Sequence, residues 1–120
     1  MMLDWNEYRR QLFATIANIG KTSPETVRGY RALSDAGAKT AVLDAKTREL
    51  IALGVSVTRQ CDGCITTHIA AAITHGATRE EVIEALGVAV AVNAGAALVF
   101  SARAVDAFDA TVAAAAPEAG

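Results

Sequence analysis

The sequence predicts an all-α fold, a single-domain bundle of about six helices. Three observations support this prediction: apolar residues recur at helical spacing, helix caps and stops divide the chain, and the composition is rich in alanine with only two prolines. The length of 120 residues suits one domain, residues 1–120, and 52% hydrophobic residues can form a core without staples. No repeat, linker or second domain is evident.

The first two helices are expected in the N-terminal third. Residues 4–19 should form an amphipathic helix that ends at Gly20, because apolar side chains recur every three or four positions, at Trp5, Tyr8, Leu12, Ile16 and Ile19. Ser23 and Pro24 are typical of a helix start, as cap and first-turn residue. The second helix should run to about Asp35.

The next two helices have clear start or stop signals. Asp44 can cap a third helix over about residues 45–59. A fourth helix is expected over residues 61–75, with Gly76 as its stop.

The C-terminal part is expected to form two more helices. Thr78 and Glu81 fit a capping box that opens a fifth helix, which should reach about Val92. Residues 93–95, Asn-Ala-Gly, suggest a break or a kink before a sixth helix over about residues 96–112. The tail that follows, to Gly120, is expected to fray.

Charge and hydropathy exclude several classes of partner. A net charge of −2, with acidic and basic residues interspersed, gives no footprint for nucleic acid or an anionic membrane surface. No charged residue lies between Glu84 and Arg103, but this stretch is rich in alanine and contains Asn93 and two glycines, which is weakly apolar for a membrane span. We expect it to be buried in the core or in a subunit interface. The N-terminus lacks a secretion-signal pattern, so we expect a cytoplasmic protein.

Both cysteines and one of the two histidines lie within residues 61–68, Cys-Asp-Gly-Cys-Ile-Thr-Thr-His. Cys61, Cys64 and His68 would share one helical stripe, with His68 one turn after Cys64. A helix N-terminus lowers the pKa of a thiol in its first turn, whereas the charge of Asp62 opposes this. The spacing allows a redox dithiol, a pair of metal ligands or two inert buried thiols.

Two further residues bear on these alternatives. His75 could complete a zinc set with the cysteines and His68, but a short helix cannot easily surround one ion, and His75 fits better as a last-turn residue. Glu49 lies in the third helix. It either pairs with a neighbouring cation, Lys46 or Arg48, or it reaches His68 and forms a carboxylate–histidine–thiol relay.

Three segments resemble one known family. They are Lys46-Thr-Arg-Glu-Leu-Ile-Ala-Leu53, then Cys61-x-x-Cys64-x-x-x-His68, and His75-Gly-Ala-Thr-Arg-Glu-Glu-Val82 with Ala85. Together they are similar to the AhpD-like branch of the carboxymuconolactone decarboxylase family. The resemblance is strongest over residues 43–108.

The resemblance implies an all-α fold assembled as homotrimers or homohexamers. It implies thiol-dependent reduction of hydroperoxides, or of the disulfide of a peroxiredoxin partner, with a small-thiol or dithiol reductant and no bound cofactor. Cys61 and Cys64 would be the redox pair, His68 the proton acceptor and Glu49 its relay partner. One departure is Gly63, where the best-known members carry an aromatic residue.

Two other functions are weighed against this one. A carboxymuconolactone decarboxylase-type lyase, acting on a small cyclic carboxylic acid, would use His68 and Glu49 without the cysteine pair. A non-enzymatic zinc-binding module would hold metal stoichiometrically and unfold when it is removed.

Overall fold

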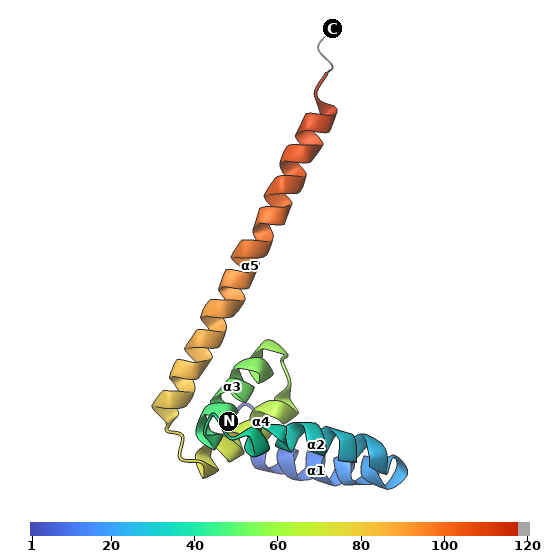
Figure 1. Ribbon diagram of the computed structural model, residues 1–120, viewed down its shortest axis with the longest axis vertical. Helices are drawn as coiled ribbons and strands as arrows, with labels where there is room; N and C mark the ends of the chain where they lie inside the picture. Colours follow the sequence, from blue (N-terminus) through green and yellow to red (C-terminus); the bar gives the residue numbers. More distant parts are fainter. Residues whose placement is uncertain (118–120) are drawn as a thin grey trace.

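The computed structural model describes residues 1–117, which form five helices and no strand (Figure 1). The all-α, single-domain prediction is therefore confirmed, although the chain has one helix fewer than expected. The helices are α1 (Trp5–Thr22), α2 (Pro24–Thr40), α3 (Ala45–Thr58), α4 (Asp62–Thr74) and α5 (Arg79–Ala115).

The predicted caps are confirmed at three helix ends. The side chain of Asp44 accepts a hydrogen bond of 2.8 Å from the backbone N–H of Thr47 at the start of α3. Thr78 and Glu81 form a reciprocal capping box at the start of α5. Gly76, with φ of +86°, lies just beyond α4 in the left-handed conformation that ends many helices.

Two predicted boundaries are wrong, because the glycines involved serve packing between helices. α1 continues past Gly20 to Thr22, and the space where Gly20 would carry a Cβ lies 3.5 Å from the side chain of Val27 in α2. α2 continues past Gly37 to Thr40, and the side chain of Arg48 occupies the space beside Gly37. Local sequence does not distinguish such a glycine from a helix stop.

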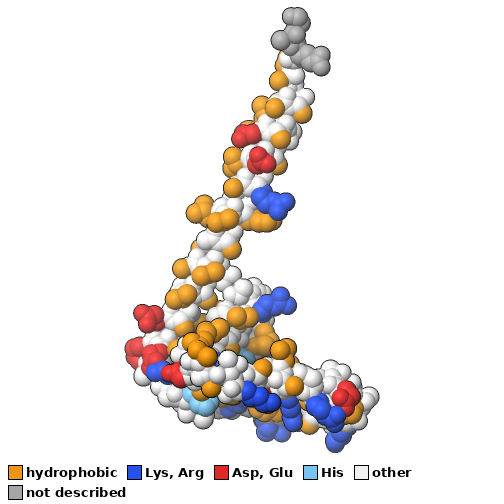
Figure 2. Space-filling view, in the orientation of Figure 1, with side chains coloured by type: hydrophobic (Ala, Val, Ile, Leu, Met, Phe, Trp, Pro, Cys, Tyr) orange, Lys and Arg blue, Asp and Glu red, His pale blue; other side chains and the backbone are white. Residues whose placement is uncertain are grey.

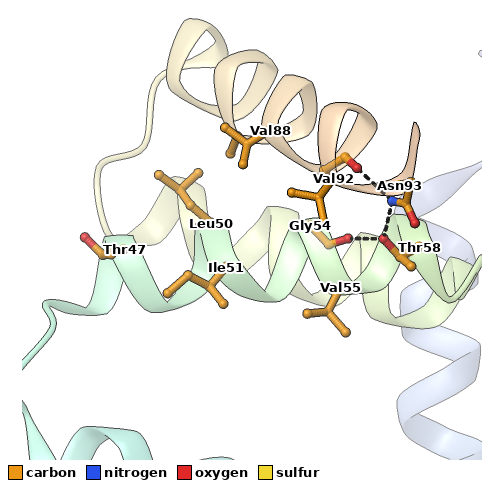
Figure 3. Close-up of a pocket in the computed structure, with 11 residues that line it drawn as sticks. Thr47, Leu50, Ile51, Gly54, Val55, Thr58, Val88, Val92 and Asn93 are labelled. Carbon is orange, nitrogen blue, oxygen red and sulfur yellow. Dashed lines mark hydrogen bonds between the residues drawn. The ribbon is translucent and has the colours of Figure 1, made fainter. Parts of the chain in front are cut away.

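The predicted break at residues 93–95 does not exist, so the expected fifth and sixth helices are one helix, α5. Asn93 donates hydrogen bonds of 2.8 Å from Nδ2 to the carbonyl of Ala89 and to the hydroxyl of Thr58 (Figure 3). Its side chain thus binds within the helix and to α3 instead of opening a turn, and Gly95 is tolerated in the interior of the helix. Residues 118–120 of the tail expected to fray lie outside the described residues.

α3 lies at the centre of the packed part of the chain. It contacts α4 and α5, whereas α1 packs against α2 and α4 (Figure 1). The most buried side chains hold these helices together, and they are Leu53, Ser56, Thr66, Ala72 and Ala89.

The second half of α5 projects away from the other helices, and the molecule measures 72 × 39 × 36 Å (Figure 1). Hydrophobic side chains follow this helix along its length (Figure 2). The charge-poor segment between Glu84 and Arg103 was expected to be buried in the core or in a subunit interface. Within the single chain, only Ala89 of this segment is buried. By length and composition α5 is also apolar enough to cross a membrane.

A groove of about 540 Å³ runs between α3 and the first half of α5. Its walls are almost entirely apolar, with Leu50, Ile51 and Val55 on one side and Val88 and Val92 on the other (Figure 3). The groove is open to solvent, and several of its aliphatic side chains are more than half exposed.

Candidate active site

The turn between α3 and α4 places Cys61 at the start of the second helix. Gln60 has a φ of +53°, and the backbone N–H groups of Gln60 and Cys61 donate to the carbonyls of Val57 and Ser56, each at 3.1 Å. This is the Schellman arrangement, which normally uses glycine where this chain has Gln60. It anchors the backbone of Cys61 directly to Ser56, a buried residue in the last turn of α3.

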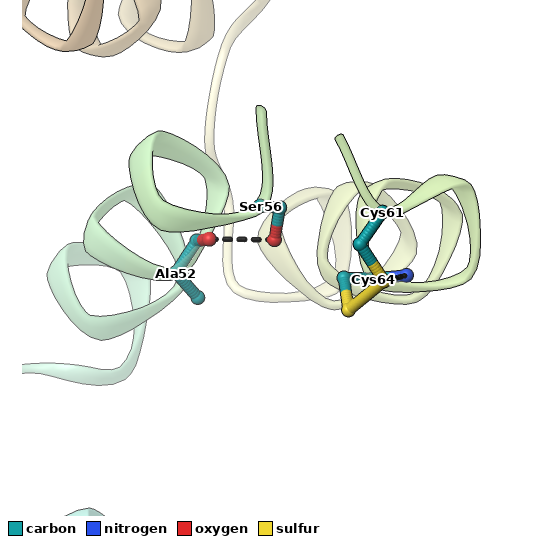
Figure 4. Close-up of a disulfide and its surroundings, with 4 residues drawn as sticks. All are labelled: Ala52, Ser56, Cys61 and Cys64. Carbon is teal, nitrogen blue, oxygen red and sulfur yellow. Dashed lines mark hydrogen bonds between the residues drawn. A yellow bond between two sulfur atoms is a disulfide. The ribbon is translucent and has the colours of Figure 1, made fainter. Parts of the chain in front are cut away.

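Cys61 and Cys64 form a disulfide, with their Cα atoms 5.2 Å apart (Figure 4). Cys61 is the N-cap of α4, and its Sγ accepts a hydrogen bond of 3.2 Å from the backbone N–H of Cys64. Both residues are half-buried. The pair therefore lies within reach of solvent, at a helix end whose free N–H groups favour negative charge.

Glu49 and His68 are in direct contact across α3 and α4. Oε2 of Glu49 lies 2.7 Å from Nδ1 of His68, and the side chains are 22% and 26% exposed. Because the carboxylate accepts at Nδ1, Nε2 is the ring nitrogen left for exchange of a proton. His68 follows Cys64 by one turn of the same helix, so the disulfide lies about one helical turn from the Glu49–His68 pair.

The alternative for Glu49, a surface pair with a neighbouring cation, is wrong. Lys46 instead pairs with Glu81 of α5 at 2.8 Å, and Arg48 donates to the carbonyl of Leu43. His75 is the C-cap residue of α4, as expected, and lies apart from the other candidate residues. Within residues 1–117, no three His, Cys, Asp or Glu side chains are placed to hold one metal ion.

Gly63, where the best-known relatives carry an aromatic residue, lies against a side chain of α1. A Cβ at Gly63 would lie only 2.8 Å from Cδ2 of Leu12. Leu12 thus fills the space beside the backbone between the cysteines, where an aromatic side chain would otherwise have to fit. This contact could not be predicted from the sequence, because the two residues are far apart in the chain.

Polar contacts fix α1 on α4 next to Leu12. The Oγ1 of Thr66, a buried residue, donates to the carbonyl of Trp5 at 3.2 Å, and Nη1 of Arg9 donates to the Oγ1 of Thr66 at 3.3 Å. Sequence reasoning missed both Arg9 and Thr66. A buried threonine in the middle of a helix is the one local signal that could have drawn attention to this contact.

Comparison with known proteins agrees with this geometry. The sequence pattern of the carboxymuconolactone decarboxylase family matches residues 24–116. An uncharacterized protein of Haemophilus influenzae is 44% identical over 108 residues, which cover 90% of this chain and 96% of the relative. Uncharacterized protein 4 in the cox locus of Paracoccus denitrificans is 38% identical over 80 residues, which cover 67% of this chain and 72% of the relative.

A solved structure extends the comparison to the fold. The crystal structure of an apo carboxymuconolactone decarboxylase family protein from Legionella pneumophila matches with a TM-score of 0.70 and 37% identity. The match covers 88% of this chain and 94% of the other. The region matched by the family pattern includes the Cys61–Cys64 disulfide and the Glu49–His68 pair. This chain therefore belongs to the carboxymuconolactone decarboxylase family.

Proposed function

We propose that this protein is a thiol-dependent oxidoreductase of the AhpD-like branch. It reduces hydroperoxides, or the disulfide of a protein partner such as a peroxiredoxin, through Cys61 and Cys64. The observation that carries the proposal is a Cys61–Cys64 disulfide at the start of the same helix that holds His68 against Glu49. A reversible dithiol needs a nearby base, and this helix supplies one.

With a hydroperoxide, the proposed cycle has two steps that form the Cys61–Cys64 disulfide and a third that reduces it. A thiol first gives up its proton, and the thiolate attacks the terminal peroxide oxygen, so that an S–O bond forms and the O–O bond breaks. The leaving alkoxide takes up the proton that the thiol lost and departs as the alcohol. The second thiol then attacks the sulfenic acid, so that the Cys61–Cys64 bond forms and water leaves. A small thiol or dithiol returns the disulfide to two thiols by exchange and is itself oxidised.

The contacts of the two sulfurs support different roles. Cys61 Sγ accepts from the N–H of Cys64 at the helix start, which favours the thiolate form of Cys61. His68 lies one turn beyond Cys64 and is the nearer base for that thiol. We therefore assign the attack to Cys61 and the resolving step to Cys64, with Glu49 orienting the imidazole of His68.

The proposal extends to assembly. A homotrimer or homohexamer in the cytoplasm would cover the apolar surface of α5 that a single chain leaves exposed. Leu98, Phe108 and Val112 are 75%, 68% and 55% exposed, and they belong to the second half of α5. Apolar surface of this extent is typical of a protein–protein interface.

The Glu49–His68 contact also supports a second candidate function. A carboxylate-oriented imidazole can move the proton that a lyase must transfer on a small cyclic carboxylic acid. Such a lyase would not use the sulfurs of Cys61 and Cys64.

One set of variants separates the two functions. The purified full chain is assayed with an organic hydroperoxide and a dithiol, and separately with a muconolactone carboxylate for loss of carbon dioxide. We expect dithiol-dependent peroxide reduction that Cys61→Ser and Cys64→Ser each abolish. His68→Gln should slow it by about 100-fold or more, and His75→Gln serves as the matched control. Decarboxylation that survives both serine variants, with no peroxide reduction by the parent protein, would establish the lyase instead.

A further inference from the structure

A second concave site lies on the opposite side of α4 from the Glu49–His68 pair. It is a cleft of about 590 Å³ between α1 and α4. Helix α4 presents His68 to α3 but Thr66 to α1, so the cleft is separate from the candidate active site. Its main walls are Trp5, Asn6 and Arg9 of α1 and Ile65, Ile69 and Ile73 of α4.

Arg9 gives this apolar cleft a positive charge without a negative partner. Its Nη1 donates to the carbonyl and the hydroxyl of Thr66 at 3.4 and 3.3 Å, and its Nη2 donates to Oδ1 of Asn6 at 2.9 Å. All three acceptors are neutral. Among the residues that the structure describes, no carboxylate lies within 4.0 Å of the Arg9 guanidinium. The neighbouring Arg10, by contrast, pairs with Glu7.

The guanidinium is held in place before any ligand arrives. Thr66 is only 3% exposed, and its hydroxyl accepts from Arg9 while donating to the carbonyl of Trp5. Arg9 and Trp5 are therefore fixed relative to α4. These contacts use only two of the three guanidinium nitrogens, and a guanidinium has five N–H donors in a planar fork. Donors remain for an incoming carboxylate, which matches that fork in a two-point contact.

We propose that the α1–α4 cleft binds a small carboxylate with an apolar tail. The carboxylate pairs with Arg9, and the tail lies along the isoleucines of α4 from Ile65 towards Ile73. These two positions are separated by a helical rise of about 12 Å. Ile73 is 65% exposed, so the far end of the cleft stays open to tails of different length. A few oriented polar groups in a mostly apolar cavity are typical of small-molecule sites.

The chain contains its own reporter for this site. Trp5 is its single tryptophan and lines the cleft, so tryptophan fluorescence reports on occupancy. The full-length protein is titrated with octanoate and with octan-1-ol, which differ in the charged group. We expect a saturable fluorescence change with octanoate at concentrations about ten-fold lower than with octan-1-ol, the difference a charge-assisted two-point contact can supply.

Three arginine variants test the role of the charge. Arg9→Gln should remove the preference for octanoate over octan-1-ol, and Arg9→Lys should keep only part of it, because lysine retains the charge but cannot make the planar two-point contact. Arg10→Gln is the matched control and should behave as the parent protein. Equal binding of the acid and the alcohol, an unaltered preference in Arg9→Gln, or no saturable change at Trp5 would each overturn the proposal. Since Cys61 and His68 take no part, peroxide reduction can fail without affecting this result.

Discussion

Among single residues, Glu49 and His68 form the contact on which the proposed chemistry depends. They are 19 residues apart, yet their side chains lie 2.7 Å apart because α3 and α4 pack as a hairpin. Both side chains are about three-quarters buried, where a hydrogen-bonded pair keeps a fixed orientation. The carboxylate thus selects the tautomer of His68 that leaves Nε2 available, and in the proposed cycle this nitrogen exchanges a proton with the thiol.

Substitution of Glu49 by glutamine should keep the contact but remove its charge. We expect Glu49→Gln to fold normally and to lower the rate of peroxide reduction by about ten-fold or more, because the imidazole loses the carboxylate that fixes its orientation and tautomer. The rate is measured under saturating dithiol. Glu84→Gln, at an exposed position of α5, is the control. A parental rate in Glu49→Gln would show that the pair is structural only.

At the scale of helices, the packing of α1 against α4 depends on the absence of a side chain at Gly63. Leu12 occupies the space that a side chain at position 63 would need. We expect Gly63→Tyr, which restores the aromatic residue of the best-known relatives, to lower the free energy of unfolding by about 1–3 kcal/mol through overpacking. Urea unfolding measures this change.

The contact with Leu12 is isolated by a double-mutant cycle. Leu12→Ala removes the side chain with which the tyrosine would clash. Gly63→Tyr should therefore lower the free energy of unfolding less in that background than in the parent chain. Equal costs in both backgrounds would mean that Leu12 does not exclude a side chain at position 63.

The ion pair between Lys46, at the start of α3, and Glu81, at the start of α5, should make the stability of the fold depend on pH. The hydrogen bond from Lys46 holds the pKa of Glu81 below its ordinary value of 4.5, and the backbone N–H of Thr78 adds to the effect. A carboxyl whose pKa is lower in the folded state stabilises the fold above its unfolded-state pKa, and this stability is lost as the pH falls through the folded-state pKa.

The unfolding free energy should therefore decline as the pH drops below about 4.5, the ordinary value for this carboxyl. We expect Glu81→Gln to lose less stability than the parent chain between neutral pH and about pH 3, as followed by urea unfolding. Glu84→Gln should keep the parental dependence. An identical pH profile for Glu81→Gln and the parent would contradict the role given to this pair.

Sequence reasoning succeeded where the signal is local and failed where it is not. The caps at Asp44 and Thr78 depend on residues three positions away, so the sequence alone predicts them. Asn93 was misjudged because its hydrogen bond to Thr58 joins two helices and removes the reason for a turn. The packing of Leu12 against Gly63 was not predicted, because it depends on how α1 packs on α4. The contact between Glu49 and His68 was one of two alternatives, and only the packing of α3 against α4 decides between them.

At the scale of the whole molecule, α5 has one face suited to a second copy. In its projecting half, apolar or small residues follow a seven-residue repeat, which is typical of helices that pair: Leu98, Ser101, Val105, Phe108 and Val112. The three charged residues of this half are spaced three apart: Arg103 and Asp106 lie away from this stripe, and Asp109 lies at its edge.

A charge placed in this stripe should disrupt assembly. We expect Phe108→Lys to lower the mass of the particle in solution, because a lysine would be buried without a partner at the interface. Ala110→Lys, on the charged side of the helix, is the matched control. Multi-angle light scattering at several concentrations gives the mass. An unchanged mass in Phe108→Lys would place the interface elsewhere.

The central claim is that Cys61 and Cys64 are a redox pair that His68 activates. The most direct test is alkylation of the reduced protein with iodoacetamide across pH, read by mass spectrometry before and after one equivalent of an organic hydroperoxide. We expect one thiol to react well below the ordinary thiol pKa of about 8.5, and peroxide to convert both thiols to one internal disulfide. Conversion should be slower in His68→Gln. Two thiols that titrate normally and do not respond to peroxide would contradict the proposed function.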